Sequence, residues 1–305
     1  MYVIGNEVRG RAMTEDAVLP FGLHRFHPDE LGRKSRYSVP NRLLALYLSI
    51  SFIWIVFSDR LVSAAFPDHA TQSWVNTVKG IAFVVVTTIV MYVAVSVQTR
   101  RSDTAQRKLE DAWDETILGW ALAMDARESH LAQHSQRVAD MTVDLARRMG
   151  IPGEQLRTLY RGALLHDIGK LGVPEAVLSY PGKLNDEQWA LIRQHPQNAV
   201  RMLSLIDFLD GALDIPHSHH ERWDGSGYPQ GLEGTDIPQW ARIFAVTDVY
   251  DALTSYRSYH RTRSHDEAMA IIRAESGAQF DPEVVREFEL MMQADRQQRA
   301  SSECH

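Results

Sequence analysis

Cysteine is almost absent from the sequence: the one cysteine, Cys304, is the residue before the C-terminal histidine. A single thiol cannot form a disulfide within the chain, and it cannot build a zinc site made of cysteines. From about residue 115 onward, the sequence also lacks any run in which apolar and polar residues alternate as they do along a strand. An intrachain disulfide and a cysteine-built zinc site are therefore excluded, and the C-terminal part is predicted to be helical.

Positive charge is scarce in the C-terminal part of the chain. Residues 109–305 carry nineteen lysines and arginines against thirty-one aspartates and glutamates, within a formal net charge of -7 for the whole chain. Duplex nucleic acid is bound by a basic surface, so it is excluded as a partner. A small anionic substrate would need metal ions or a few local cations.

Charged residues are missing from two stretches, residues 43–57 ("LLALYLSISFIWIVF") and residues 81–97 ("IAFVVVTTIVMYVAVSV"). Soluble helices rarely lack a polar face over such a length, so two membrane spans are predicted, with two buried core helices as the alternative. Basic residues flank both outer ends, namely Arg33, Lys34, Arg36 and Arg42 before the first run and Arg100, Arg101, Arg107 and Lys108 after the second. Because basic flanks stay in the cytoplasm, both ends are expected there.

The sequence thus predicts a transmembrane hairpin over residues 43–97 with a short periplasmic loop. Residues 1–42 show no sustained periodicity and are predicted to be a flexible cytoplasmic segment. Residues 98–118 are predicted to be a connecting helix, because the apolar residues Leu109, Trp113, Ile117 and Trp120 recur at helical spacing. This apolar stripe is either the seam of a homodimer or a surface that packs against its own domain, and both alternatives stay open.

Helix caps punctuate the rest of the chain. They are the capping-box pairs Asn185–Gln188 and Ser264–Glu267, the Asp281-Pro282 start signal, and the C-terminal glycines Gly150 and Gly277. Polar residues that can bind metals occur within these helices. His134 shares the inward face of its helix with Val138 and Leu145, where a hydrogen-bonded core histidine is the alternative to a metal ligand.

The other candidate ligands also stand in unusual places. His166 and Asp167 end an apolar helix, and a buried carboxylate is costly unless it is paired or metal-bound. His195 precedes a proline that must break its helix, His219 and His220 precede a glycine-rich turn, and Asp248 lies in an apolar stretch. Seven donors are too many for one metal, so two metal ions are the economical count.

Several motifs occur in a fixed order: His134, "LLHDIGKLGVP", "QHP", "HHERWDGSGYP", "IPQWARI" and "TDVYDALTSYRSY". With them, residues 115–292 resemble the HD-GYP domains of the HD superfamily of metal-dependent phosphohydrolases. The resemblance implies an all-α fold, an HD-type helical domain after the N-terminal hairpin. It also implies hydrolysis of cyclic di-GMP, either to pGpG alone or onward to GMP. The resemblance does not extend to the hairpin, whose apolar runs and basic flanks separately predict a protein of the bacterial inner membrane. The alternatives are a catalytically silent module that binds a cyclic dinucleotide or recruits a partner, and a phosphodiesterase for another cyclic dinucleotide such as cyclic GMP-AMP.

The resemblance also implies roles for single residues. One metal would take His134, His166, Asp167 and Asp248, and the other would take His195, His219 and His220, with Asp167 bridging the two. Iron or manganese is the metal that the resemblance favours. Lys170 would steady the scissile phosphate and act with Asp167 in catalysis. Arg257 would grip a substrate phosphate, and Tyr228 would stack on the substrate, hydrogen-bond it or serve the structure alone.

Departures from the family pattern concern the substrate contacts and the metal count. His260 stands where the family has a basic residue, so the phosphate contact is expected to be weaker or pH-dependent. His130 stands where some members have a glutamate and bind three metals, and it is expected to be a neighbour of the ligands or to hold a third ion. The catalytic domain is predicted over residues 119–292, followed by a disordered tail over residues 293–305.

Overall fold

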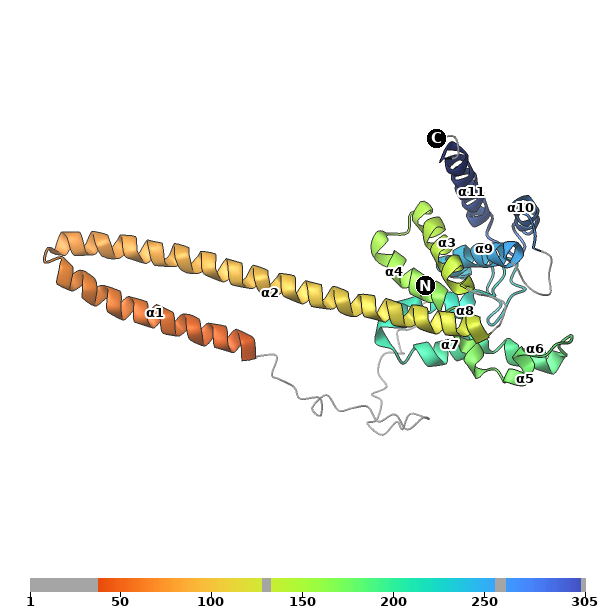
Figure 1. The fold of residues 1–305 in the computed structure, drawn as a ribbon, viewed down its shortest axis with the longest axis horizontal. Helices are drawn as coiled ribbons and strands as arrows, with labels where there is room; N and C mark the ends of the chain where they lie inside the picture. The colour runs from red at the N-terminus through yellow and green to blue at the C-terminus, as the bar shows by residue number, and fades with distance from the viewer. Residues whose placement is uncertain (1–37, 128–132, 256–261, 303–305) are drawn as a thin grey trace, which may run out of the picture. The chain divides into compact units, whose positions relative to one another are not determined.

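The computed structural model describes residues 38–127, 133–255 and 262–302. The chain divides into two compact units, Met1–Thr99 and Arg100–His305, and each is described by itself. The described residues form helices joined by turns and contain no strand, which confirms the all-α fold class. Figure 1 shows the helices in chain order.

The first unit holds α1 (Ser38–Ala65) and the first part of α2 (His69–Arg127). Both helices are long and apolar enough to cross a membrane. Their apolar side chains are mostly exposed, with Phe52 at 70% and Tyr92 at 73%, whereas a core helix of a soluble domain buries such side chains. Trp54 stacks on Phe83, and Lys79 forms an ion pair with Asp59, so these contacts join the two helices.

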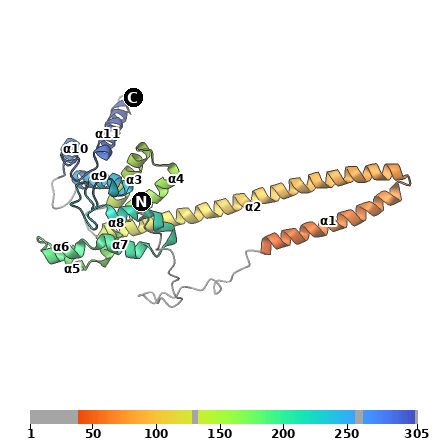
Figure 2. The same cartoon turned by 180° about the vertical axis from the view of Figure 1, so that it is seen from behind.

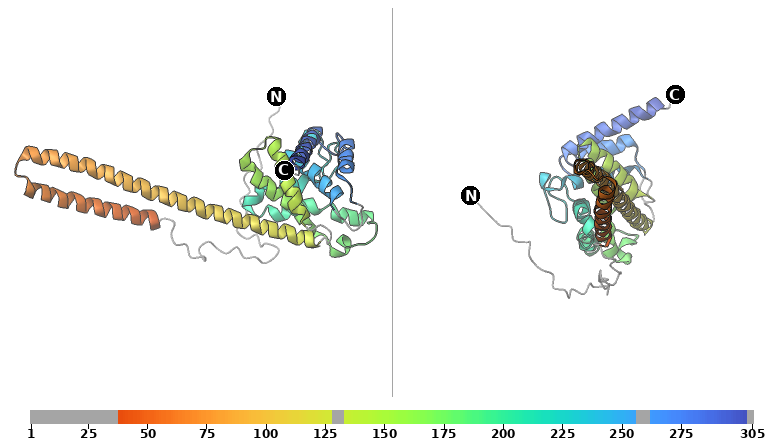
Figure 3. Two further views of the ribbon diagram at one scale, coloured as in Figure 1. Left: turned by 45° about the horizontal axis from the view of Figure 1, so that its top comes forward. Right: turned by 90° about the vertical axis from the view of Figure 1, so that its left-hand side faces the viewer.

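The second unit begins with the C-terminal part of α2 and continues through short helices. They are α3 (His134–Arg148), α4 (Gly153–Leu164), η1 (Ile168–Gly172), α5 (Glu175–Leu178), α6 (Asp186–Ile192), α7 (His195–Leu203), η2 (Asp207–Ala212), α8 (Asp214–Ser218), η3 (Gly234–Asp236), α9 (Gln239–Thr254), α10 (His265–Ala274) and α11 (Pro282–Ser302). Helix α3 packs between α4 and α9, α7 lies beside α8 (Figure 2), and α10 packs on α9 and α11 near the C-terminal end (Figure 3). The fully buried Val138, Leu145, Phe244 and Phe288 lie at the centre of this packing.

The predicted caps are confirmed. Asn185 and Ser264 each accept a hydrogen bond from the backbone of the residue three positions later, and each capping box is complete. Asp281 accepts a hydrogen bond from the Glu283 N–H at 2.8 Å at the start of α11. Gly150 and Gly277 have positive φ angles of 80° and 82°, a conformation that side chains with a Cβ rarely adopt.

The predicted connecting helix is not a separate element, because α2 continues without a break to Arg127. The apolar residues of this stripe differ in their exposure to solvent. Ile117 is 1% exposed in the core, and the Trp113 ring stacks on Phe208 with centroids 4.4 Å apart. Leu109 and Trp120, in contrast, are 52% and 43% exposed. The inner part of the stripe therefore packs against its own domain, and a homodimer through the exposed part stays a prediction.

Two helix ends differ from their predictions. Helix α4 ends at Leu164 rather than at Asp167, and Asp167 precedes the tighter helix η1, whose Gly169 meets the backbone of α7. Helix α11 continues to Ser302, where a disordered tail was predicted from residue 293. The extension has a local cause, since residues 291–302 contain no glycine or proline and include good helix formers such as methionine, glutamine and alanine.

Candidate metal centre

The seven predicted ligands lie together in two groups. The first cluster contains His134, His166 and Asp248, and the second cluster contains Asp167, His195, His219 and His220. Within each cluster, the possible ligand atoms lie within 4.8 Å of one another. The residues come from the start of α3, the turn between α4 and η1, the start of α7, the turn after α8 and the middle of α9. The packing of these five segments therefore assembles donors that are far apart in the sequence.

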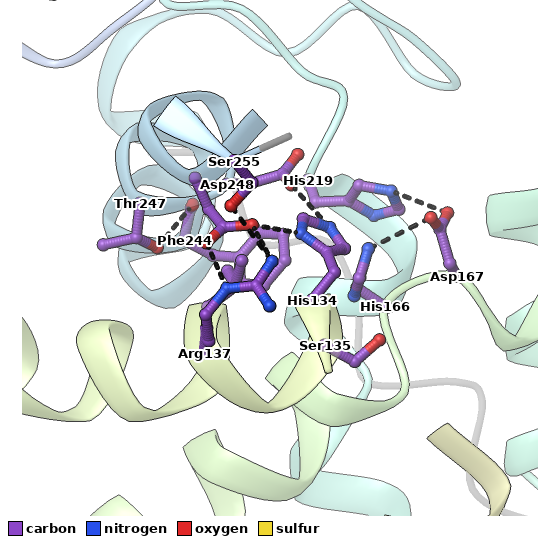
Figure 4. A network of polar contacts seen from close by, with 12 residues as sticks. His134, Ser135, Arg137, His166, Asp167, His219, Phe244, Thr247, Asp248 and Ser255 are labelled. Atoms are coloured by element: carbon purple, nitrogen blue, oxygen red, sulfur yellow. Dashed lines mark hydrogen bonds and ion pairs between the residues drawn. The ribbon is translucent and has the colours of Figure 1, made fainter. Parts of the chain in front are cut away.

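Asp167 belongs to the second cluster and also contacts the first, and Figure 4 shows its contacts with His166 and His219. Its Oδ2 atom is 3.1 Å from Nε2 of His166, a member of the first cluster. Its Oδ1 atom is 3.3 Å from Nε2 of His195 and 3.8 Å from Nε2 of His219, both in the second cluster. A carboxylate that presents one oxygen to each cluster has the arrangement that a bridging ligand requires.

The imidazole rings are oriented by their outer nitrogens. The Nδ1 atoms of His166, His195 and His219 lie 3.0, 2.8 and 3.0 Å from backbone carbonyl oxygens three or four positions earlier in the chain. A carbonyl oxygen can only accept, so each Nδ1 carries the proton and donates it. Nε2 is therefore the nitrogen of each ring that is directed into the site, and it can bind a metal ion when it carries no proton.

The charges of the site favour a bound cation. Asp167 Oδ1 is buried and has no hydrogen-bond partner among the described residues. Burial disfavours its charged form, but Lys170 and His166 outweigh this and hold the pKa of the Asp167 carboxyl well below its usual range. An ionised, buried oxygen without a donor is costly, and a cation beside it removes that cost.

The histidines of the two clusters differ in their affinity for a proton. Burial lowers the pKa of His195 to about 4, so this imidazole is neutral at neutral pH and can use its lone pair. Burial also opposes charge on His134, but hydrogen bonds to Asp248 and Asp251 raise its pKa to about 10. Two carboxylates that stabilise a proton on this ring also attract a metal ion. The mixture of imidazole and carboxylate donors suits iron, manganese, zinc or cobalt.

Comparison with known proteins gives the family. A model of the HD domain matches residues 122–284, more than half of the chain. The chain belongs to the HD domain family. This confirms the resemblance drawn from the motifs.

Curated relatives share this region. Over 201 residues, the chain is 36% identical to a cyclic di-GMP phosphodiesterase of Vibrio cholerae, covering 61% of this chain and 41% of that protein. Over 162 residues, it is 42% identical to a cyclic di-GMP phosphodiesterase of Pseudomonas aeruginosa, covering 53% and 39%. It is also 40% identical over 165 residues to 3'3'-cGAMP-specific phosphodiesterase 1 of Vibrio cholerae, covering 53% and 38%. The chain thus matches less than half the length of each of these relatives.

The glycine-rich turn of this HD domain closes one side of the second cluster. A Cβ on Gly227 would lie 2.4 Å from the backbone nitrogen of Arg222, so only glycine fits there. The next residue, Tyr228, stacks on His220 with ring centroids 4.7 Å apart. Burial raises the pKa of Tyr228 to about 12, which keeps its hydroxyl protonated. Tyr228 thus packs on a predicted metal ligand, and its contact with a substrate stays a prediction.

The remaining predicted site residues are placed only in part. Lys170 Nζ lies 2.7 Å from Asp167 Oδ2, so the ammonium group lies beside the Asp167 carboxylate. Its contact with a phosphate stays a prediction. Arg257, His260 and His130 lie outside the described residues.

Three buried acids of the HD domain were missed by sequence reasoning. Asp125 accepts hydrogen bonds from the N–H and the hydroxyl of Ser135, at 3.1 and 2.6 Å, and so holds the start of α3. Glu221 accepts the N–H groups of Gln230 and Leu232, at 2.7 and 3.1 Å, and anchors the glycine-rich turn. Asp251 contacts His134. The signal for Asp251 was its position three residues after Asp248, on the same side of α9.

Proposed function

We propose that the HD domain hydrolyses a phosphodiester bond of cyclic di-GMP and yields pGpG, which it can hydrolyse further to GMP. The observation that supports this most is the position of Asp167, with one carboxylate oxygen directed to each of two donor clusters. The curated relatives named cyclic di-GMP phosphodiesterases support the choice of substrate.

The proposed centre holds two divalent metal ions, iron or manganese. One ion takes His134, His166 and Asp248, the other takes His195, His219 and His220, and Asp167 is shared. When bound, such a pair of cations activates water for attack on phosphorus and neutralises charge on the phosphate. The role of His130 as a neighbour of the ligands or as a ligand of a third ion stays a prediction.

The chain's own residues supply the remaining roles. Asp167 brings negative charge between the two cation positions, which reduces their mutual repulsion. Lys170 supplies a positive charge beside this carboxylate and is proposed to steady the phosphate. Tyr228 and His260 are proposed as further substrate contacts.

A second candidate substrate is 3'3'-cGAMP, because a relative that is specific for it is 40% identical to this chain. A silent module that only binds a cyclic dinucleotide is the other alternative. It is disfavoured because all seven donors are present and assembled, and converged metal donors are typical of catalytic sites.

The test is incubation of the metal-loaded, full-length protein with cyclic di-GMP and, separately, with 3'3'-cGAMP, followed by identification of the products. We expect pGpG or GMP from the first nucleotide. Faster turnover of 3'3'-cGAMP would establish the second candidate instead. A metal-loaded protein that binds either nucleotide and hydrolyses neither would contradict the enzymatic proposal.

We also propose that α1 and the apolar part of α2 anchor the chain in the bacterial inner membrane, with the catalytic domain in the cytoplasm. Both helices are long and apolar enough, and basic residues stand outside both ends of the hairpin. Reporter fusions after residue 108 are expected to behave as cytoplasmic, and fusions in the loop at residues 66–68 as periplasmic. The opposite pattern would contradict this topology.

Replacing Arg257 by alanine is expected to raise KM about tenfold or more while the metal content stays at the wild-type value. The reason is that a charge-assisted contact to phosphate is lost and no metal ligand is touched. Steady-state kinetics and elemental analysis of the same preparation measure both quantities. Loss of metal from this variant would instead mark Arg257 as a structural residue.

A further inference from the structure

Asp251 belongs to neither cluster but contacts a member of the first. The residue is 3% exposed, and its Oδ2 atom lies 2.7 Å from Nδ1 of His134. Arg137 donates to the same carboxylate, from Nε to Oδ1 at 2.7 Å and from Nη2 to Oδ2 at 2.9 Å. Both oxygens are therefore already engaged by donors. Neither cluster of possible metal ligands in the described part of the chain includes Asp251.

The contact distinguishes His134 from three other imidazoles of the two clusters. The Nδ1 atoms of His166, His195 and His219 face backbone carbonyl oxygens, which no substitution of a side chain can remove. The Nδ1 atom of His134 faces a side chain. Its opposite nitrogen, Nε2, lies 3.3 Å from Asp248 Oδ1, which is another member of the first cluster. The orientation of the His134 ring therefore depends on a residue that can be changed.

We propose that Asp251 is a positioning residue of the metal centre. It accepts the Nδ1 proton of His134 and thereby leaves Nε2 as the atom that binds a cation in the first cluster. Arg137 holds the carboxylate for this task through its two-point contact, which fixes the plane of the carboxylate as well as its position. The inference rests on the metal centre of the proposed function and is independent of the nucleotide that the centre hydrolyses.

Asparagine at position 251 cannot reproduce these contacts, because it has one accepting oxygen and one NH2 group that only donates. If the NH2 group faces Arg137, two donors oppose each other in a buried place. If the NH2 group faces His134, it favours the ring form with the proton on Nε2. A proton on Nε2 blocks the lone pair that a metal ion needs.

The network also includes Ser255, the residue after the end of α9. Arg137 Nη2 donates to Ser255 Oγ at 3.0 Å, and the Ser255 N–H donates to the Asp251 carbonyl at 2.8 Å. Ser255→Ala removes only the outer hydrogen bond of the network and leaves the contact between Asp251 and His134 in place. Ser255→Ala is therefore a control variant that removes a hydrogen bond of Arg137 but none of His134.

The test is titration of Mn²⁺ into metal-free, full-length protein, with elemental analysis of the loaded samples. Asp251→Asn is expected to weaken binding of one of the two ions by about 10- to 100-fold, the range for residues that orient a metal-bound imidazole. Ser255→Ala is expected to bind Mn²⁺ as the wild type does. Wild-type affinity for both ions in Asp251→Asn would overturn the proposal.

A matched control distinguishes an effect of His134 orientation on Mn²⁺ affinity from an effect of lowered protein stability. Asp281 is also a buried aspartate, 4% exposed, whose carboxylate pairs with Arg242 and accepts the Glu283 N–H. Asp281→Asn is expected to lower the Tm while both Mn²⁺ affinities stay unchanged. An equal loss of Mn²⁺ affinity in Asp281→Asn would mean that the effect at Asp251 is only structural, and the proposal would be wrong.

Arg137→Lys decides the matter if Asp251→Asn does not fold. Lysine keeps the positive charge but cannot bond both carboxylate oxygens in one plane, so weaker binding of one ion is expected. Unchanged Mn²⁺ binding in this variant would overturn the proposal. A wild-type protein that binds two ions and hydrolyses neither nucleotide would contradict the proposed function and leave this inference intact.

Discussion

Replacing Asp167 by asparagine is expected to abolish turnover, with a loss of more than about 100-fold, because the charge between the two cation positions is removed. The carboxylate presents Oδ2 toward His166 and Oδ1 toward His195, and an amide offers only one accepting oxygen. Its NH2 group would point a donor at one of the two cation positions. The metal content is therefore expected to fall from two ions per chain to one or none.

Elemental analysis and product formation from cyclic di-GMP measure the two effects in one preparation. Asp144→Asn is the control, because Asp144 is an exposed aspartate on α3 that pairs only with Arg147 in the described structure. This control is expected to keep wild-type metal content and rate, since an exposed ion pair contributes little. If Asp167→Asn keeps both values, the shared-ligand arrangement is wrong.

Several of the seven candidate metal donors could be singled out in the sequence because they conflict with their surroundings. Asp248 interrupts an apolar stretch, and His166 and Asp167 follow a helix whose face is otherwise apolar. A polar side chain that the periodicity directs inward must find a partner, and the sequence offered other inward donors as partners. The division into two clusters came with the resemblance. In the structure the five histidines and Asp248 divide in that way, whereas Asp167 groups with His195, His219 and His220 rather than with the first cluster.

The residues that hold the ligands could not be predicted in the same way. Asp251 and Arg137 are 114 positions apart, and their contact exists only because α3 packs on α9. In the sequence, Asp125 looks like any other acidic residue in the last turn of a long helix. Its hydrogen bonds exist only because the fold brings Ser135, at the start of α3, next to it. A single sequence does not distinguish an exposed acidic residue from a buried one when the apolar residues of the helix do not clearly mark its buried face.

Helix ends were predicted well where a local capping motif decides them and poorly elsewhere. The capping boxes at Asn185 and Ser264 act within four residues, so the sequence contains the whole cause. The end of α4 at Leu164 has no such motif, and the tight helix that follows packs against α7. The contact between η1 and α7 thus sets the end of α4. Gly169 lies in this contact.

Gly169→Ala is expected to disrupt the second cluster although Gly169 binds no metal. A Cβ at this position would lie 1.8 Å from the His195 carbonyl oxygen and 2.6 Å from the Ala199 backbone nitrogen. Both neighbours are backbone atoms of α7, which cannot move aside as a flexible side chain can. The start of α7 or the turn at Asp167 must therefore shift, and the separation of His195 from Asp167 changes with it.

The expected result is a loss of about 1–3 kcal/mol of stability from overpacking and a fall in turnover of about 100-fold, because a displacement near 1 Å is enough to misplace reacting groups. Thermal unfolding, Mn²⁺ titration and product formation measure these effects. Gly119→Ala is the matched control, since Gly119 is exposed on α2 and a Cβ there meets nothing within 4 Å. The control is expected to be neutral or slightly stabilising, because alanine favours the helix. Wild-type metal binding and turnover in Gly169→Ala would show that the close approach of η1 to α7 does not set the position of the ligands.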